Sequence, residues 1–209
     1  MQFHLHDLVV SHRLLKSFAF LMPFSPYRGI VFWMLNKSVK SILDVGCREG
    51  AAMQSINLRR LHIWRLGVDL DLESLRRCKK SSIYDDIILC DARWLPLSSK
   101  CLDCVLCIEF IEHLKKKDAI RFLEDIEKIA RKQTIITTPV GYIKEPPSYS
   151  PLLQHVSQWH PGEFRSKEYN VKGMIGPSFL PMVLAYWLSH IFCLTYFWPE
   201  LSHEMICVK

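Results

Sequence analysis

The chain has 209 residues, which is the size of one α/β domain: large enough to bury a continuous core and too short for two comfortable domains. Of its residues 49% are hydrophobic and 23% are charged, so the composition excludes a disordered chain and a fibrous repeat. The formal net charge of +6 comes from small basic groups spread along the sequence, which are more typical of solvated helix ends than of a nucleic-acid site. We therefore expect one globular domain and disfavour nucleic acid as a partner.

Several of the eight cysteines lie in apolar runs that resemble buried strands, among them Cys90, Cys104 and Cys107. Free thiols in a reducing compartment fit this placement better than disulfides. The amino-terminal stretch lacks the uninterrupted apolar run and cleavage site of a secretory signal, because residues such as Asp7 and Arg13 interrupt it. We expect a cytoplasmic protein.

Short apolar runs alternate with helix-like stretches between residues 41 and 138. Predicted strands cover residues 41–45, 65–69, 86–90, 102–108 and 133–138. A predicted helix begins near Ala51, another covers residues 72–80, and a third covers residues 117–131 with Ile120, Leu123 and Ile126 on its apolar face. This alternation predicts a parallel sheet with helices on both faces.

The composition changes after Pro139, where a segment rich in proline, serine and aromatic residues indicates a long ordered loop. Two more strands are predicted at residues 169–173 and 204–208. Between them, residues 179–198 form an apolar stretch without a charge. We expect a helical insertion that does not span a membrane, because the last strand must return to the sheet. We expect this insertion to cover the substrate entrance, to pack on the amino-terminal helix or to rest on a membrane surface. Because the stretch lacks the lysines that usually rim an interfacial helix, packing is favoured over membrane contact.

The turn after the first strand is the strongest chemical feature of the sequence. Asp44, Gly46 and Gly50 lie in ILDVGCREG, where the strand runs into a helix. Glycines permit positive φ and let a ligand approach the backbone, and the following helix directs free N–H groups toward it. Asp69 and Asp91 end the second and third predicted strands. Because open α/β sheets bind ligands at the carboxyl ends of their strands, we expect all three acids to face one crevice.

The fourth predicted strand runs into Glu109-Phe-Ile-Glu112-His113-Leu, which we expect to line the crevice where a substrate enters. Glu109, Glu112 and His113 are therefore candidate catalytic residues, although His113 has the alternative of a capping or packing role. His155 and His160 are further candidate proton acceptors, with the alternative of ordinary surface histidines in a polar loop. No metal site is predicted.

The glycine turn, the acids at the strand ends and the Glu-His-Leu segment occur between Lys40 and Pro139 in an order and at a spacing that resemble the class I S-adenosylmethionine-dependent methyltransferases. The resemblance implies an α/β, Rossmann-like, seven-stranded and mostly parallel sheet with an antiparallel last strand, and S-adenosyl-L-methionine as the cofactor. It also implies a single methyltransferase domain over residues 1–209. Within it, residues 1–36 form a helical cap, residues 37–139 the cofactor-binding core, and residues 140–209 the substrate-side segment.

The resemblance further implies which residues bind the cofactor. They are Asp44 and Gly46 at its methionine end, Gly50 at the helix start, Asp69 on the ribose, Asp91 and Ala92 on the adenine, and Cys47, Arg48, Leu70 and Ile108 beside these. Arg48 departs from the family pattern, which has a further glycine at that position. Its side chain either points away from the cofactor or pairs with the cofactor carboxylate, and a cofactor-free paralogue is a third interpretation.

Two other cofactor classes fit the sequence less well. A nicotinamide-binding fingerprint needs a glycine where Arg48 stands, and it leaves Asp44 without a purpose. Cys101, Cys104 and Cys107 have the spacing of iron–sulfur ligands, but side chains alternate along a strand, so Cys104 should face away from the other two. Methyl transfer is the expected activity, and a non-catalytic partner subunit that binds adenosylmethionine is the alternative.

The acceptor in such enzymes is selected by segments outside the cofactor core. Here these segments are residues 1–36 and 140–200, and both are rich in apolar and aromatic residues. A lipid, a quinone or a lipid-linked sugar is therefore the favoured acceptor, ahead of a nucleic acid or a small polar metabolite.

Overall fold

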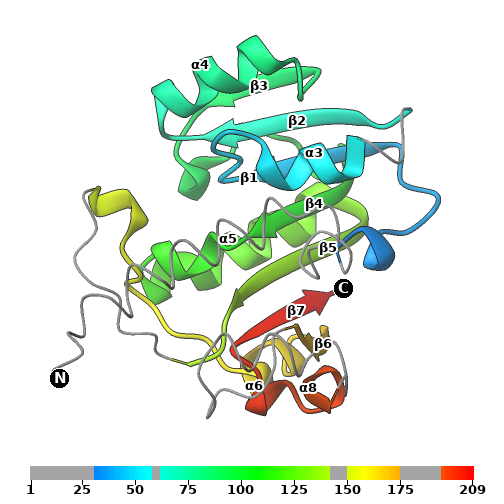
Figure 1. Cartoon of the computed structure of the whole chain (residues 1–209), viewed down its shortest axis with the longest axis vertical. Helices are drawn as coiled ribbons and strands as arrows, with labels where there is room; N and C mark the ends of the chain where they lie inside the picture. Colours follow the sequence, from blue (N-terminus) through cyan, green and yellow to red (C-terminus); the bar gives the residue numbers. More distant parts are fainter. Residues whose placement is uncertain (1–30, 58–61, 142–149, 175–193) are drawn as a thin grey trace, which may run out of the picture.

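The structure is a computed structural model that describes residues 31–57, 62–141, 150–174 and 194–209. Seven strands form one sheet in the order β3-β2-β1-β4-β5-β7-β6 (Figure 1). The strands are β1 (Ser41–Val45), β2 (Trp64–Asp69), β3 (Asp86–Leu89), β4 (Leu102–Ile108), β5 (Ala130–Pro139), β6 (Asn170–Gly173) and β7 (Glu204–Val208). Strands β1 to β5 pair in parallel, whereas β7 is antiparallel to both β5 and β6. The predicted Rossmann-like sheet with an antiparallel last strand is confirmed.

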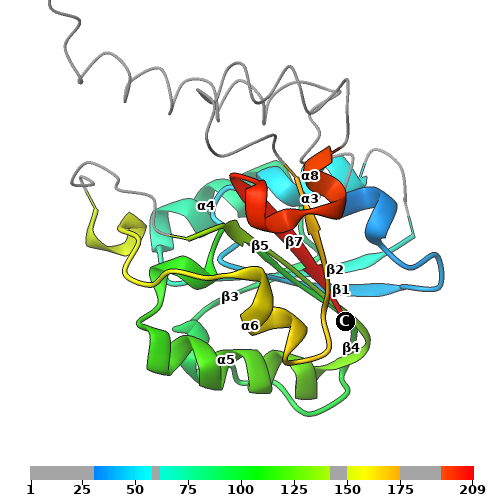
Figure 2. The ribbon, with the colours of Figure 1, turned by 90° about the horizontal axis from the view of Figure 1, so that it is seen from below.

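Helices cover both faces of this sheet. The helices are α3 (Ala51–Asn57), α4 (Leu72–Ser81), α5 (Lys116–Ile129), α6 (Pro161–Arg165) and α8 (Leu194–Phe197), with single 3-10 turns η1 (Ala92–Trp94), η2 (Ile111–His113), η3 (Pro151–Leu153) and η4 (Pro199–Leu201). In Figure 2, α3, α4 and α8 lie on one side of the sheet and α5 and α6 on the other. The core is accordingly divided into two apolar layers, one on each face.

Strand β4 shows how one strand serves both layers. Cys104 and Leu106 pack in the layer beneath α3 and α4, whereas Val105 and Cys107 pack in the layer beneath α5. Cys101 packs against the same layer as Cys107, so Cys104 faces away from both. The alternation expected of a strand is confirmed, and these thiols cannot share one iron–sulfur cluster. All seven cysteines in the described part of the chain are free.

Helix α5 presents a slightly different face to the core than the sequence suggested. Its buried residues are Ala119, Phe122, Leu123, Ile126 and Ile129. The prediction that Ile120 belongs to the apolar face is wrong, since Ile120 is 39% exposed. The buried stripe begins at Ala119 and continues at three- and four-residue steps, which places Ile120 at its edge.

The segment after Pro139 also contains more structure than the expected loop. Within its described part lie η3 and α6, and α6 begins at Pro161, a residue suited to the first helical turn. Glu163 supports this start by accepting a hydrogen bond from the backbone N–H of His160 at 2.9 Å. A proline with a glutamate two residues later was the available sequence pattern for this short helix.

Strand β7 returns to the sheet, as the sequence analysis expected, and it lies beside β5 with Pro139 opposite Glu204. Most of the expected insertion at 179–198 lies outside the described residues, which include only its last part, with α8. The expected amino-terminal cap lies outside them as well, except for residues 31–36, which include a helical turn at 31–34. Among the described helices, none combines the length and the apolar character that crossing a membrane requires.

Candidate functional site

A cleft with a volume of about 540 Å³ lies at the carboxyl ends of β1 to β4. Cavities of this size hold small-molecule ligands and cofactors. Its walls comprise the turn after β1, the ends of β2 and β3, the segment that follows β4, the start of α5, and residues 150–153 with Val156. The sheet topology thus brings the predicted crevice into one place, as the order of strands requires.

The turn after β1 is tight because three of its residues have positive φ. These are Gly46 at 71°, Arg48 at 46° and Gly50 at 80°. The N–H of Gly46 donates to the carbonyl of Val68 at 2.9 Å, which ties the turn to β2. A Cβ atom added to Gly46 would lie 2.3 Å from a ring carbon of Phe110. Glycine is therefore required at position 46 by both conformation and space.

Asp44 lies behind this turn and does not line the cleft. It is 2% exposed, and the hydroxyl of Tyr84 donates to its Oδ2 at 2.5 Å. Burial raises the pKa of Asp44 to about 7, the Tyr84 hydrogen bond lowers it, and the charge of Asp69 raises it. Tyr84 lies 40 residues further along the chain, and sequence reasoning missed it.

Asp69 lines the cleft and connects two turns. Its Oδ2 accepts a hydrogen bond from the N–H of Arg48 at 2.7 Å, and its Oδ1 accepts one from the N–H of Asp71 at 2.8 Å. Asp71 in turn caps α4 by accepting from the N–H of Glu73 and the hydroxyl of Ser74. The Asp69 carboxylate therefore holds the two turns of the cleft wall together, and each of its oxygens can still accept a further hydrogen bond.

Asp91 and Ala92 follow β3 and line the opposite part of the cleft. The Asp91 carboxylate accepts from the backbone N–H of Arg93 at 2.9 Å and pairs with the Arg93 guanidinium at 2.5 Å. The hydrogen bonds from Arg93 hold the pKa of Asp91 below its usual range. The carboxylate is therefore ionised at neutral pH, and Arg93 shares it with any ligand that binds there.

Six of the ten expected cofactor residues line the cleft, and four lie behind it. The six are Gly46, Arg48, Asp69, Leu70, Asp91 and Ala92, and the four are Asp44, Cys47, Gly50 and Ile108. Cys47 and Ile108 pack in the apolar layer beneath α3 and α4. A Cβ atom on Gly50 would lie 3.0 Å from Ile83 and from Tyr84. These four residues support the turn from within the core.

The expected catalytic residues follow β4, and they too are split between the cleft wall and the buried interior. Glu109 and His113 line the cleft, whereas Glu112 does not and is 2% exposed. The Thr137 hydroxyl donates to Glu109 Oε1 at 3.0 Å, and the Thr138 hydroxyl donates to Glu112 Oε2 at 3.0 Å. Both threonines end β5 and were missed by sequence reasoning, because their role depends on the pairing of β5 with β4.

His155 lies against this segment, whereas His160 remains exposed. The carbonyl of Glu112 accepts hydrogen bonds from the N–H groups of Val156 at 2.9 Å and Ser157 at 3.1 Å. These bonds hold His155 beside Glu112, where its side chain is only 11% exposed. For His155, the alternative of an ordinary surface histidine is therefore wrong.

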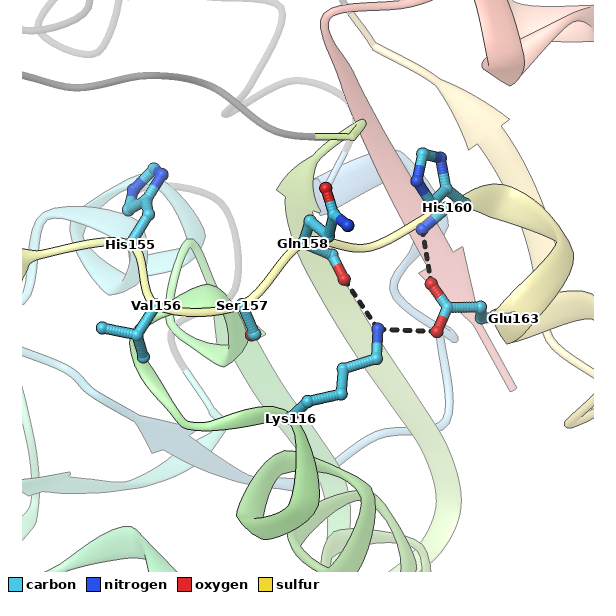
Figure 3. A pocket seen from close by; sticks show the side chains of 7 residues that line it. All are labelled: Lys116, His155, Val156, Ser157, Gln158, His160 and Glu163. Carbon is cyan, nitrogen blue, oxygen red and sulfur yellow. Dashed lines mark hydrogen bonds and ion pairs between the residues drawn. The ribbon is translucent and has the colours of Figure 1, made fainter.

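A second cavity, also of about 540 Å³, lies along residues 155–163 (Figure 3). Lys116 Nζ donates to the carbonyl of Gln158 at 2.6 Å and pairs with Glu163 at 2.6 Å. The same ammonium lies 3.3 Å from the ring centroid of Trp159. Lys116 therefore fastens this segment to the start of α5. Figure 3 shows the His155 ring directed away from this lysine network.

We expect an Arg48→Gly variant to be at least as stable as the parent protein. A non-glycine residue in the left-handed region costs about 1–2 kcal/mol, and the greater chain entropy of glycine offsets about 0.5–1 kcal/mol of the relief. Urea denaturation of both proteins measures the difference. A clear loss of stability would show that Arg48 is not strained. If Arg48 pairs with the cofactor carboxylate, the same variant binds S-adenosylhomocysteine more weakly.

Comparison with known proteins finds a matching domain within the chain. Residues 43–137 match the family model described as a methyltransferase domain. No curated protein sequence matches the chain significantly. The fold is similar to that of a SAM-dependent methyltransferase from Archaeoglobus fulgidus, with a TM-score of 0.56, 16% identity, and 87% of this chain and 93% of that chain covered.

Two further solved structures share the fold. A SAM-dependent methyltransferase from Aquifex aeolicus has a TM-score of 0.57 at 12% identity, with 99% of this chain and 98% of that chain covered. The plantazolicin methyltransferase BpumL, solved in complex with SAH, has a TM-score of 0.61 at 17% identity, with 96% of this chain and 87% of that chain covered. The chain therefore contains a segment at residues 43–137 that matches the methyltransferase-domain model, and it shares its fold with S-adenosylmethionine-dependent methyltransferases.

Proposed function

We propose that the chain transfers a methyl group from S-adenosyl-L-methionine, the cofactor of the methyltransferases that share its fold, to an acceptor that enters past Glu109 and His113. The observation that carries the proposal is the turn from Gly46 to Gly50. Its three positive φ angles and its hydrogen bond from Arg48 to Asp69 form a cradle at the carboxyl ends of parallel strands. A cofactor is then held where acceptor and methyl group can meet.

Within this proposal the ribose hydroxyls donate to Asp69, and the adenine lies against Asp91, Ala92 and Leu70. Each Asp69 oxygen holds one backbone N–H and can accept a second hydrogen bond. The methionine end lies over Gly46, where the missing Cβ leaves room, with Arg48 near its carboxylate. Asp44, Cys47, Gly50 and Ile108 take part by supporting the turn from behind.

Methyl transfer is an in-line displacement at a carbon bound to a sulfonium, so alignment and exclusion of water are the main contributions of the protein. A base is needed only when the acceptor atom carries a proton at the working pH. Glu109 and His113 lie in the cleft wall and are the proposed groups for that task. Buried Glu112 acts through its histidine neighbours.

We further propose that the acceptor has a large apolar part, as in a lipid, a quinone or a lipid-linked sugar. Leu70, Leu152 and Val156 line the cleft and are 48%, 52% and 50% exposed. Apolar side chains exposed at the entrance of a cleft favour an apolar ligand. In this proposal residues 37–139 bind the cofactor, and residues 1–36 and 140–209 select the acceptor.

Asp69→Ala is expected to weaken binding of S-adenosylhomocysteine about 10- to 100-fold. The variant loses charge-assisted hydrogen bonds of about 1.5–3 kcal/mol, and it also releases the N–H groups of Arg48 and Asp71. Titration calorimetry measures the affinity, and Glu124→Ala, which removes an exposed acid from α5, is the charge-matched control. Equal affinities of the Asp69 variant and the parent protein would remove Asp69 from the ribose role.

Turnover tests the activity itself. Purified protein is incubated with adenosylmethionine labelled in the methyl group and with lipid or polar extracts, and labelled products are separated. We expect label in the lipid fraction. Cofactor binding without transfer to any fraction would favour the non-catalytic partner subunit, and transfer only to polar products would contradict the apolar acceptor.

A further inference from the structure

Three side chains with metal-binding groups converge beside the cleft. Glu112, His113 and His155 each offer one ligand atom, and these atoms all lie within 4.8 Å of one another. Glu112 is buried, and both histidines are partly buried. Two imidazoles and one carboxylate form a recurrent ligand set of catalytic zinc and non-haem iron sites.

The carboxylate of this cluster is oriented by its surroundings. Thr138 donates to Glu112 Oε2 at 3.0 Å, while Glu112 Oε1 lies 3.9 Å from Nε2 of His155. The carbonyl of Glu112 holds the chain directly after His155 through two backbone hydrogen bonds, from Val156 and Ser157. The ligand atoms are therefore positioned by secondary contacts of the kind that surround metal ligands in proteins.

His113 has a hydrogen-bond partner of the kind that ligand histidines have. Its Nδ1 lies 3.2 Å from the carbonyl oxygen of Gln154. A neutral imidazole that donates its Nδ1 proton to this carbonyl presents the lone pair of Nε2, and metal-binding histidines usually have such a partner on the other nitrogen. The rings of His113 and His155 are 4.9 Å apart and inclined at 64°, so they do not stack in parallel.

The segment that carries His155 is also fastened from its other side. Lys116 binds the carbonyl of Gln158 and the carboxylate of Glu163, as Figure 3 shows. The His155 ring is directed away from this ammonium. The Lys116 network therefore fixes the segment that carries His155 without occupying the direction in which the His155 ring points.

We infer that Glu112, His113 and His155 bind a divalent first-row transition metal ion, with zinc as the reference ion, at the wall of the cleft. Zinc binds imidazole nitrogen and carboxylate oxygen at about 2.0–2.2 Å, so its ligand atoms lie about 3.3–3.5 Å apart. Side-chain rotations that bring the three atoms closer together by up to about 1.4 Å form the site. Three protein ligands leave at least one coordination position open, and His113 places the site in contact with the cleft.

The role of the ion rests on the proposed function. An acceptor hydroxyl bound at the open position has a lowered pKa and loses its proton to water. The oxygen then forms a bond to the methyl carbon while the carbon–sulfur bond breaks, and the electron pair stays on sulfur. The products are the methyl ether and S-adenosylhomocysteine, with one proton released.

Metal binding is measured on the full chain without substrate. The protein is first treated with a chelator and then titrated with Zn²⁺ and with Co²⁺. We expect one ion per chain at this site, and we expect His155→Ala and Glu112→Gln each to weaken binding at least about tenfold, the effect that losing a supporting group alone can have. His160→Ala, which removes an exposed histidine of the same segment, is the matched control and should bind as the parent protein does.

The Co²⁺ spectrum distinguishes binding at this site from binding to the free thiols. Nitrogen and oxygen ligands give visible ligand-field bands without thiolate-to-cobalt charge transfer, and His155→Ala should abolish these bands. Unchanged Zn²⁺ affinity in both variants, or a Co²⁺ spectrum dominated by thiolate, would overturn the proposal. Because His155 does not line the cleft, S-adenosylhomocysteine affinity of His155→Ala should equal that of the parent protein. Failure of cofactor binding in the parent protein would instead contradict the proposed function.

Discussion

When the pH is raised from 4 to 8, we expect the unfolding free energy of the parent protein to fall by about 4 kcal/mol relative to that of an Asp44→Asn variant. The folded protein holds the pKa of Asp44 at about 7, against 3.8 for an unperturbed aspartate. At about 1.36 kcal/mol per pKa unit, the difference corresponds to about 4 kcal/mol. The folded chain binds a proton that the unfolded chain releases, so the stabilising contribution is fully present below pH 4 and is lost as the pH rises through 7.

The measurement compares urea unfolding of both proteins at several pH values between 4 and 8. Asparagine does not ionise, so the other groups of the protein cancel in the difference between the two curves. Asp86→Asn is the control, because Asp86 is an exposed acid at the start of β3. A stability difference between parent and Asp44→Asn that stays constant with pH would show that Asp44 is ionised in the folded protein throughout.

Gly46→Ala is expected to destabilise the fold by about 2–5 kcal/mol. Positive φ at a residue with a Cβ costs about 1–2 kcal/mol, and forcing a methyl group into a packed site costs about 1–3 kcal/mol. The added carbon would lie 2.3 Å from Phe110 Cδ2 and 2.9 Å from its Cγ. Because Phe110 lines the cleft, its displacement also disturbs the ligand site.

Chemical denaturation of this variant is compared with that of Gly162→Ala. Gly162 lies in α6 without positive φ, and a Cβ atom added there would meet no other atom within 4 Å, so alanine should change stability by less than about 1 kcal/mol. In a Phe110→Ala background the steric part of the Gly46→Ala cost should disappear and the conformational part remain. A Gly46→Ala protein as stable as the parent would contradict the geometry of the turn.

The strands were the most predictable part of the fold. The bounds of β1, β4 and β7 agree with the sequence analysis because each is a short apolar run that ends at polar or turn-forming residues. The face of α5 was harder to predict, since Ile120 is as apolar as its buried neighbours and only the position of the sheet decides which of them it covers. The start of α6 depends on a hydrogen bond from His160 to Glu163 that composition alone does not reveal.

In the candidate site, too, some residues could be predicted from the sequence and others could not. Gly46, Asp69 and Asp91 were found because strand ends in an α/β sheet converge, a consequence of topology that can be read from the sequence. Tyr84 was not assigned to the site, and His155 was named only as a candidate proton acceptor in a polar loop, because the positions of both depend on contacts between distant segments. Tyr84 reaches Asp44 across 40 residues, and His155 is held by the carbonyl of Glu112.

Titration of the full chain with S-adenosylmethionine is the most direct test of the central claim, that the cleft between Gly46, Asp69 and Asp91 binds this cofactor. Calorimetry at neutral pH should show saturable binding of one molecule per chain. S-adenosylhomocysteine should compete for the site, and a nicotinamide dinucleotide should not. Absence of binding, or equal competition by the dinucleotide, would contradict the assignment of the cleft.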